Sequence, residues 1–234
     1  MLSKKNQLLN NYKNRPAPVG LPKAPADRCF ECNDTGYVSY EGKNGYSCCR
    51  PCDCIYKKTK RMLFGENYVD KNFENYEGRS LTMTKAKEYL SKNPVGSYLI
   101  SGKVGLGKTH LLAGLYEALC KRFFGKIFNK KELDLLEYLK AGSKWLDDFK
   151  DTDYQVVQID DLGKVDLAKW DVERFFRFYD YISSNKIYLQ ITTNMTAEEI
   201  GKAYGSAITD RLFRNNKCEI IYIKEADLSD EGLK

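Results

Sequence analysis

Five short runs of strand-favouring residues recur from residue 97 onward, and segments with apolar residues at helical spacing lie between them. The runs span residues 97–102, 126–130, 155–160, 186–194 and 218–224. The stretch from His110 to Tyr116, close behind the first run, is an example of the helical spacing. Strands that alternate with helices are typical of a parallel sheet. The pattern therefore predicts an α/β domain with a five-stranded parallel sheet.

Two other segments have shorter helical patterns. Apolar residues between Leu133 and Phe149, interrupted by Gly142, allow two short helices at most between the second and third strands. Residues 207–212 predict one more short helix before the last strand.

The segment between the first strand and the following helix matches a phosphate-binding loop at every defining position. Its residues are Gly102, Lys103, Val104, Gly105, Leu106, Gly107, Lys108 and Thr109, and His110 completes the predicted nucleotide-binding segment. We expect positive φ values at the three glycines, because such values turn backbone N–H groups toward phosphate oxygens at the positive end of a helix. Lys108 is expected to reach the β- and γ-phosphates of ATP, and Thr109 to place its hydroxyl on Mg²⁺.

Polar side chains follow two later strands. The run at 155–160 ends in Asp160 and Asp161, about fifty residues after the phosphate loop. One such carboxylate can hold Mg²⁺ and its neighbour can orient the attacking water, so we assign Asp160 to the metal and Asp161 to the water. Asn194, at the end of the fourth run, can contact the γ-phosphate or the water. Arg211 is a candidate arginine finger for a neighbouring subunit's nucleotide. These four residues are the predicted catalytic set.

Six of the eight cysteines lie between residues 29 and 54. They are Cys29, Cys32, Cys48, Cys49, Cys52 and Cys54. This density favours a metal site over disulfides in a cytosolic chain, and the Cys29-x-x-Cys32 spacing is typical of a zinc knuckle. The second pair is ambiguous, because Cys52 can close the site with either Cys49 or Cys54. The only histidine abuts the phosphate loop, so the zinc site is expected to be all-cysteine.

The charge is unevenly distributed along the chain, whose formal net charge is +6. Residues 1–60 contain 11 Lys and Arg against 5 Asp and Glu, and residues 61–234 contain 27 of each. We predict a helix near residues 8–12 with a proline-rich linker in 1–26, a zinc module in 27–60 and an ATPase domain in 61–234. No stretch of the sequence is typical of a membrane span or a secretion signal, so a cytoplasmic location is expected.

With these motifs in view, the chain resembles the AAA+ helicase loaders of the DnaC/DnaI type, a family that includes the IstB-like transposition ATPases. The resemblance covers about residues 70–224, from Asn72-Phe73-Glu74-Asn75-Tyr76 through the last strand, and rests on the phosphate loop and on three short motifs. They are Ile159-Asp160-Asp161-Leu162-Gly163, Ile191-Thr192-Thr193-Asn194 and Asp210-Arg211-Leu212. It implies the strand order 5-1-4-3-2. The cysteine segment is similar to the zinc module of DnaI-like loaders, which favours Cys52 and Cys54 as the closing ligands.

The resemblance also implies a function. It implies an ATPase that binds the hexameric replicative helicase, assembles on it as an ATP-dependent homo-oligomer, and delivers it to single-stranded DNA. The alternatives are an IstB-like ATPase that assists a transposase on duplex DNA, a class that generally lacks the cysteine cluster, and an adaptor that binds nucleotide without hydrolysing it. The chain departs from the family in three ways: Asp161 stands where many members have Glu, no arginine follows Arg214, and the segment between the second and third strands is short. Slow hydrolysis is expected from the first departure, because the carboxylate of Asp161 is one methylene shorter than that of Glu.

Overall fold

The computed structural model describes residues 29–42, 45–120, 122–123, 126–142, 144–165 and 167–225. The chain divides into two compact units, Met1–Ile55 and Tyr56–Lys234. The predicted N-terminal helix and proline-rich linker lie outside the described residues. The predicted boundary between residues 60 and 61 falls within helix α2 (Asp53–Phe64).

The first unit contains a two-stranded antiparallel hairpin of β1 (Tyr37–Glu41) and β2 (Ser47–Pro51), in which Tyr37 is paired with Pro51 and Glu41 with Ser47. Few of its described side chains are buried, and those include Cys32 and Cys52. A unit of this size has little apolar core, so other interactions are needed to hold it together.

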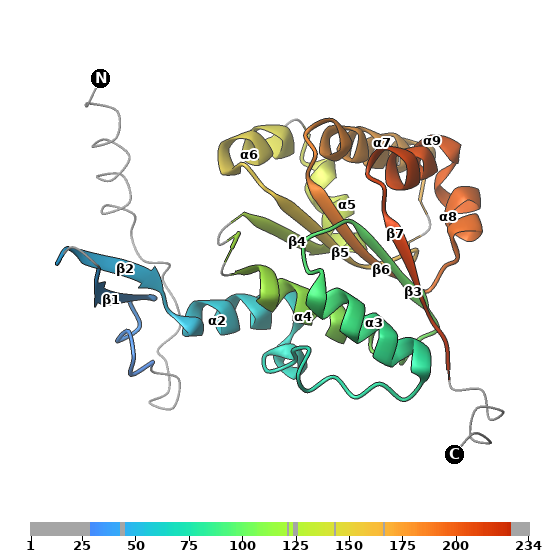
Figure 1. Ribbon diagram of the computed structural model, residues 1–234. Helices are drawn as coiled ribbons and strands as arrows, with labels where there is room; N and C mark the ends of the chain where they lie inside the picture. The colour runs from blue at the N-terminus through green and yellow to red at the C-terminus, as the bar shows by residue number, and fades with distance from the viewer. Residues whose placement is uncertain are drawn as a thin grey trace, which may run out of the picture. The chain divides into compact units, whose positions relative to one another are not determined.

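The second unit is an α/β domain with helices on both faces of a parallel sheet (Figure 1). Its strands are β3 (Tyr98–Gly102), β4 (Ile127–Lys131), β5 (Val156–Leu162), β6 (Tyr188–Thr193) and β7 (Glu219–Ile223). The strand order is β4-β5-β6-β3-β7, and every pair is parallel. Counted in chain order within the sheet this is 5-1-4-3-2, so the expected fold class and strand order are both confirmed.

Two apolar cores lie on opposite faces of this sheet. Helices α3 (Leu81–Lys92) and α4 (Lys108–Cys120) share one core, which includes Leu90, Leu111 and Leu115. The other core lies beneath the remaining helices and includes Phe149, Phe175 and Leu189. These helices are α5 (Glu132–Lys140), α6 (Lys144–Thr152), α7 (Lys169–Ser184), α8 (Ala197–Tyr204) and α9 (Ser206–Asp210), followed by the π-helical turn η3 (Arg211–Asn215). A 3₁₀ turn, η2 (Glu66–Tyr68), precedes α3.

A ladder of buried amides crosses three adjacent strands of the sheet. Asn129 Nδ2 donates to Gln158 Oε1 at 2.9 Å, and Gln158 Nε2 donates to Gln190 Oε1 at 2.8 Å. The three residues are register partners on β4, β5 and β6. A shift of register would leave these amides without partners in an apolar core, so the ladder favours this register alone.

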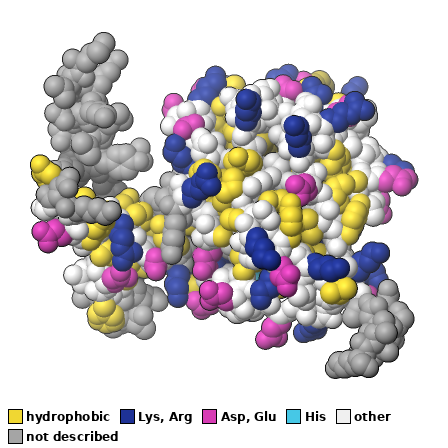
Figure 2. Space-filling model, viewed as in Figure 1, with side chains coloured by type: hydrophobic (Ala, Val, Ile, Leu, Met, Phe, Trp, Pro, Cys, Tyr) yellow, Lys and Arg dark blue, Asp and Glu magenta, His cyan; other side chains and the backbone are white. Residues whose placement is uncertain are grey.

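The surface of the second unit mixes charges of both signs. In Figure 2, basic and acidic side chains are interspersed on the face in view, with hydrophobic side chains between them. Exposed Ile220 and Tyr222 belong to the edge strand β7. Among the described helices, none combines the length and the apolar character that a membrane crossing requires.

Candidate nucleotide-binding and metal sites

The phosphate loop lies between β3 and the first turn of α4, as the sequence predicts. Gly105 and Gly107 have φ values of 86° and 75°, and a Cβ at Gly105 would meet no atom within 4 Å. Open space beside left-handed glycines is the arrangement in which backbone N–H groups receive phosphate oxygens. The expectation for Gly102 was wrong, because it is the last residue of β3 and has no positive φ. Glycine is needed there for space, since a Cβ would lie 2.4 Å from the carbonyl oxygen of Ile223.

Lys108 is buried at the start of α4, and its ammonium group has three hydrogen-bond partners. It donates to the carbonyl oxygens of Gly102 and Lys103, each at 2.8 Å, and to Asn194 Oδ1 at 2.7 Å. An ammonium group has three donors, so all of them are used. Burial lowers the pKa of Lys108, while the nearby carboxylates of Asp161 and Asp160 raise it. A phosphate that reached Lys108 would replace partners the side chain already has.

Asp160 lies buried at the end of β5, and two hydroxyl groups donate to one of its oxygens. Thr192 Oγ1 donates to Asp160 Oδ1 at 2.6 Å and Thr109 Oγ1 donates at 3.1 Å. Burial raises the pKa of Asp160 above its ordinary value of 3.8, and the hydrogen bond from Thr192 acts in the opposite direction. A threonine hydroxyl beside a carboxylate is the donor set that Mg²⁺ prefers, so Thr109 and Asp160 fit the predicted ion.

Asp161 has a left-handed backbone with φ of 62°, and its neighbours fix it from two sides. Its backbone N–H donates to Thr192 Oγ1 at 2.9 Å, and its carboxylate forms an ion pair with Lys164 Nζ at 2.7 Å. Thr192 therefore contacts the carboxylate of Asp160 and the backbone of Asp161. Sequence reasoning missed Thr192 and Lys164 as site residues, although the threonine pair that ends an otherwise apolar strand is visible in the sequence.

The other predicted loop residues have different surroundings. Val104 is exposed, Lys103 Nζ lies 3.1 Å from Glu225 Oε2, and Leu106 accepts a hydrogen bond from the hydroxyl of Tyr76. His110 Nε2 lies 2.9 Å from the carbonyl oxygen of Asn72, and burial lowers the pKa of the ring. A cavity of about 550 Å³ borders the loop, with room for the rest of a nucleotide. It is lined in part by Asn75, Tyr76, Arg79, Gly105, Gly107 and His110.

Arg211 lies away from this cluster, in η3, and packs on α7. Its guanidinium lies 3.1 Å from Asp180 Oδ1, and its central carbon lies 4.5 Å from the centre of the Phe176 ring. The structure thus brings together Lys108, Thr109, Asp160, Asp161 and Asn194 but holds Arg211 in contacts of its own.

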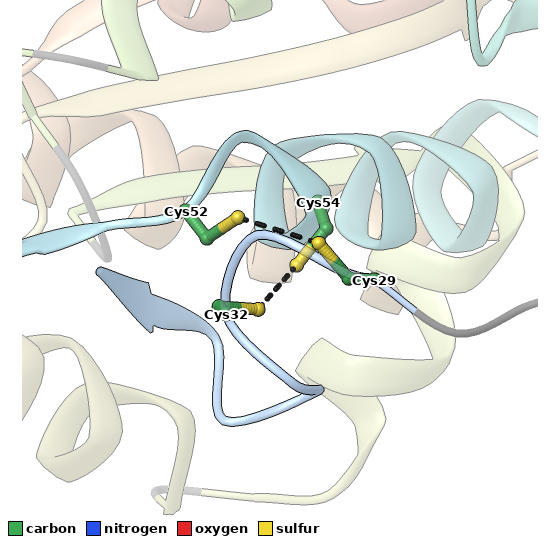
Figure 3. A group of neighbouring side chains, drawn as sticks. All are labelled: Cys29, Cys32, Cys52 and Cys54. Atoms are coloured by element: carbon green, nitrogen blue, oxygen red, sulfur yellow. Dashed lines mark hydrogen bonds between the residues drawn. The ribbon is translucent and has the colours of Figure 1, made fainter.

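Four cysteines of the first unit converge, two from the knuckle that precedes β1 and two from the segment that follows β2 (Figure 3). Cys29 Sγ lies 3.6 Å from Cys52 Sγ, and Cys32 Sγ lies 3.4 Å from Cys54 Sγ. All four sulfurs lie within 4.8 Å of one another. Tetrahedral zinc with Zn–S bonds of about 2.3 Å requires sulfurs about 3.8 Å apart, so the group fits zinc. Cys49 is exposed on β2, with its sulfur 3.7 Å from Ser39 Oγ.

The strand order, the loop between β3 and α4 and the carboxylates at the end of β5 are those of a P-loop domain with the AAA+ fold. The chain is 28% identical over 166 residues to the replicative helicase loader DnaC of Escherichia coli strain K12. The matched region covers 64% of this chain and 66% of DnaC. It therefore spans slightly less than two thirds of that relative. It is also 24% identical over 162 residues to the chromosomal replication initiator protein DnaA of Onion yellows phytoplasma, over 31% of that protein. No protein-family model matches the chain.

Solved structures share the fold. The DnaC helicase loader matches with a TM-score of 0.56 and 24% identity, over 68% of this chain and 99% of that one. DnaI matches with a TM-score of 0.55 and 20% identity, and the match covers 70% of this chain and 93% of the DnaI chain. DnaA from Aquifex aeolicus, bound to AMPPCP, matches with a TM-score of 0.51 and 18% identity, and the match covers 65% of this chain and 50% of the DnaA chain. Together with the sequence match, these likenesses confirm the resemblance to AAA+ helicase loaders of the DnaC type.

The role of Thr192 gives the first prediction. Thr192→Val removes the hydroxyl that donates to Asp160 and should raise the pKa of Asp160 further, because a hydrogen bond to the charged form favours that form. The folded chain would then hold this proton still more tightly than the unfolded chain, so ionisation of Asp160 would destabilise the fold more as the pH rises above 3.8. A ¹³C NMR titration of the Asp160 carboxyl measures the shift. Thr193→Val is the matched control, because Thr193 donates to Leu162 instead; equal pKa values in the two variants would contradict the assignment.

Proposed function

We propose that the chain is an ATP-dependent loader that binds the hexameric replicative helicase and delivers it to single-stranded DNA. The observation that carries the proposal is a complete set of phosphate-loop side chains on a fold shared with DnaC. The replicative role comes from the curated DnaC relative, which the chain matches over part of its length. We further propose that residues 27–60 form the zinc module and 61–234 the ATPase domain, after an N-terminal segment of residues 1–26.

The proposed chemistry assigns one task to each side chain. Lys108 exchanges its contact with Asn194 for the β- and γ-phosphates of ATP, and Asn194 is left to contact the γ-phosphate or the water. Thr109 and Asp160 hold Mg²⁺, which neutralises charge that develops on the phosphates. Asp161 orients the attacking water once its carboxylate is free of Lys164. Its side chain is one methylene shorter than Glu, which accords with slow turnover.

We propose that Arg211 acts in a neighbouring subunit's site rather than its own. Its pairing with Asp180 and its position over the Phe176 ring support this, because they orient the guanidinium before a partner arrives. An assembly of several copies on the helicase would bring each Arg211 to the adjacent γ-phosphate. The arrangement implies an ATP-dependent homo-oligomer.

A groove between α6 and α7 supports single-stranded DNA as a ligand of the ATPase domain. It encloses about 630 Å³ and is lined by aromatic side chains, two arginines and the two acidic residues Glu173 and Asp180. Trp170 is 72% exposed at its rim, and Arg174 and Arg177 lie one and two turns along α7. Bases stack on exposed aromatic rings with little sequence preference. Arg174 and Arg177 are paired with Asp171 and Glu173, and they would exchange these carboxylates for phosphates of the DNA backbone. Such binding suits a protein that must accept any origin strand.

The zinc module is proposed to dock on the helicase. Residues 1–60 are basic, but nearly all of the excess lies in residues 1–26, because residues 27–60 contain five acidic and six basic residues. A module that is close to neutral fits a protein surface better than DNA phosphates. A metal-held knuckle also loses little entropy on binding.

The nucleotide assignment is tested with two variants. Lys108→Ala should abolish ATP binding and helicase loading, because it deletes the charge that faces the phosphates. Asp161→Asn should bind ATP and lose hydrolysis. Calorimetry measures binding, phosphate release measures turnover, and unwinding of a primed single-stranded circle by the replicative helicase of the source organism measures loading. ATP affinity that is unchanged in Lys108→Ala would refute the site; normal hydrolysis with no loading would refute the loader role alone.

Zinc binding is tested by elemental analysis. We expect about one zinc per chain, because the four clustered sulfurs supply one tetrahedral set. Cys54→Ser should lose the metal, whereas Cys49→Ser, which changes an exposed cysteine of the same module, should retain it. The reverse result would exchange Cys49 for Cys54 as the closing ligand.

The DNA groove is tested at its most exposed aromatic residue. Trp170→Ala should weaken binding of a labelled single-stranded oligonucleotide about tenfold, because one stacked base contributes about 1–3 kcal/mol. Fluorescence anisotropy at fixed salt measures the change. Tyr222→Ala removes an exposed ring from β7 and serves as the control, with no loss expected. Equal affinities for wild type and Trp170→Ala would exclude the groove.

A further inference from the structure

Glu132 is a buried carboxylate outside the nucleotide site described above. It begins α5, directly after the end of β4, and its side chain is only 1% exposed. Burial of a charge at this depth is costly unless hydrogen bonds compensate for the lost water. The partners of Glu132 therefore indicate what the charge does.

Three consecutive backbone N–H groups donate to one oxygen of Glu132. Gly163, Lys164 and Val165 contact Oε2 at 2.9, 2.8 and 3.1 Å. Successive N–H groups that converge on one anion form a nest, in which each bond is strengthened by the full negative charge. The carboxylate thereby fixes the path of the loop that follows β5.

The other oxygen of Glu132 accepts a hydrogen bond from the hydroxyl of Tyr204. Tyr204 is the last residue of α8, and α9 and η3 with Arg211 follow it. Burial, and next the hydrogen bond to Glu132, raise the pKa of Tyr204 well above its ordinary value, so the hydroxyl keeps its proton and donates. Glu132 thus joins the start of α5, the loop after β5 and the end of α8.

The loop held by Glu132 begins two residues after Asp161. On one side, Thr192 accepts a hydrogen bond from the backbone N–H of Asp161. On the other side, Lys164 forms an ion pair with the Asp161 carboxylate, and the backbone N–H of Lys164 donates to Glu132. Asp161 and Gly163 both have left-handed φ values, of 62° and 95°. A loop with two such residues keeps its path only when neighbouring contacts determine it.

We propose that Glu132 is a positioning residue for ATP hydrolysis, because its carboxylate holds the loop at 163–165 and thereby sets the direction of the Asp161 side chain. The inference rests on the proposed ATPase function. Glu132 touches neither nucleotide nor water in this account. Its loss should impair the chemical step and leave nucleotide binding intact, since Lys108 and the glycines of the phosphate loop are not among its contacts.

Glu132→Gln and Tyr204→Phe form a matched pair of test variants. Both disturb the same buried hydrogen-bond cluster and should lower the melting temperature. Only Glu132→Gln removes the negative charge from the three N–H groups, whereas Tyr204→Phe leaves that cradle in place. A purely structural role would therefore affect melting temperature in both variants and kcat in neither.

The experiment compares kcat for ATP hydrolysis with Kd for Mg²⁺–ATP in folded, full-length protein. Glu132→Gln should lower kcat about 10- to 100-fold, because a small misplacement of a catalytic group has effects of this size. Its Kd should stay within about threefold of wild type, and Tyr204→Phe should keep kcat within about twofold. Glu132→Asp, which keeps the charge but is one methylene shorter, should give an intermediate kcat, and it carries the test if Glu132→Gln does not fold.

Two outcomes overturn the inference. The first is a wild-type kcat in Glu132→Gln, or in Glu132→Asp if Glu132→Gln does not fold. The second is a fall of kcat that is equally large in Glu132→Gln and Tyr204→Phe. Absence of hydrolysis by the wild-type chain would instead contradict the proposed ATPase function itself. Amide hydrogen exchange at Gly163, Lys164 and Val165, measured in the same samples, should be faster in Glu132→Gln than in Tyr204→Phe, and equal exchange would also contradict the inference.

Discussion

Buried charge at the carboxyl edge of the parallel sheet is the constraint on which the rest of this structure depends. Lys108 and Asp160 are both almost fully buried, and neither can remain charged there without partners. The partners come from strands far apart in sequence: Asn194 follows β6, Thr192 belongs to β6, and Thr109 begins α4. The strand register must therefore be exact, because a slip of one residue would turn the side chain of Thr192 to the other face of the sheet.

The amide ladder of Asn129, Gln158 and Gln190 meets this requirement from within the sheet. It joins the same strands, β5 and β6, whose ends carry Asp160 and Thr192. Beyond those ends, Glu132 holds the loop after β5, so three sets of buried polar contacts determine one small region. Polar groups used in this way stabilise little in net terms, but they favour one arrangement over others. The first unit has few buried apolar side chains, and its four clustered cysteines lie where an apolar core would otherwise hold the segments together.

Much of this arrangement could be predicted from the sequence because it depends on local pattern. The alternation of strands and helices, the phosphate loop and the Asp160-Asp161 pair are contiguous in the chain, and the structure has each at its expected place. The strand order came from the family resemblance, not from the pattern. Contacts between distant residues were not predictable. Lys164 and Glu132 belong to no motif, and the motif that contains Thr192 does not show that this side chain contacts Asp160; only the fold brings the three residues to the site. Gly102 was misjudged for the same reason, because the residue that requires a glycine there, Ile223, lies in another strand.

The central claim is that this buried polar cluster receives the phosphates of ATP. A crystal structure of the full chain with Mg²⁺ and AMPPCP, a non-hydrolysable ATP analogue, tests it most directly. The account predicts that Lys108 Nζ leaves Asn194 and lies within hydrogen-bond distance of the β- and γ-phosphates, with the metal on Thr109. A bound analogue whose phosphates lie elsewhere, with Lys108 still donating to Asn194, would contradict it.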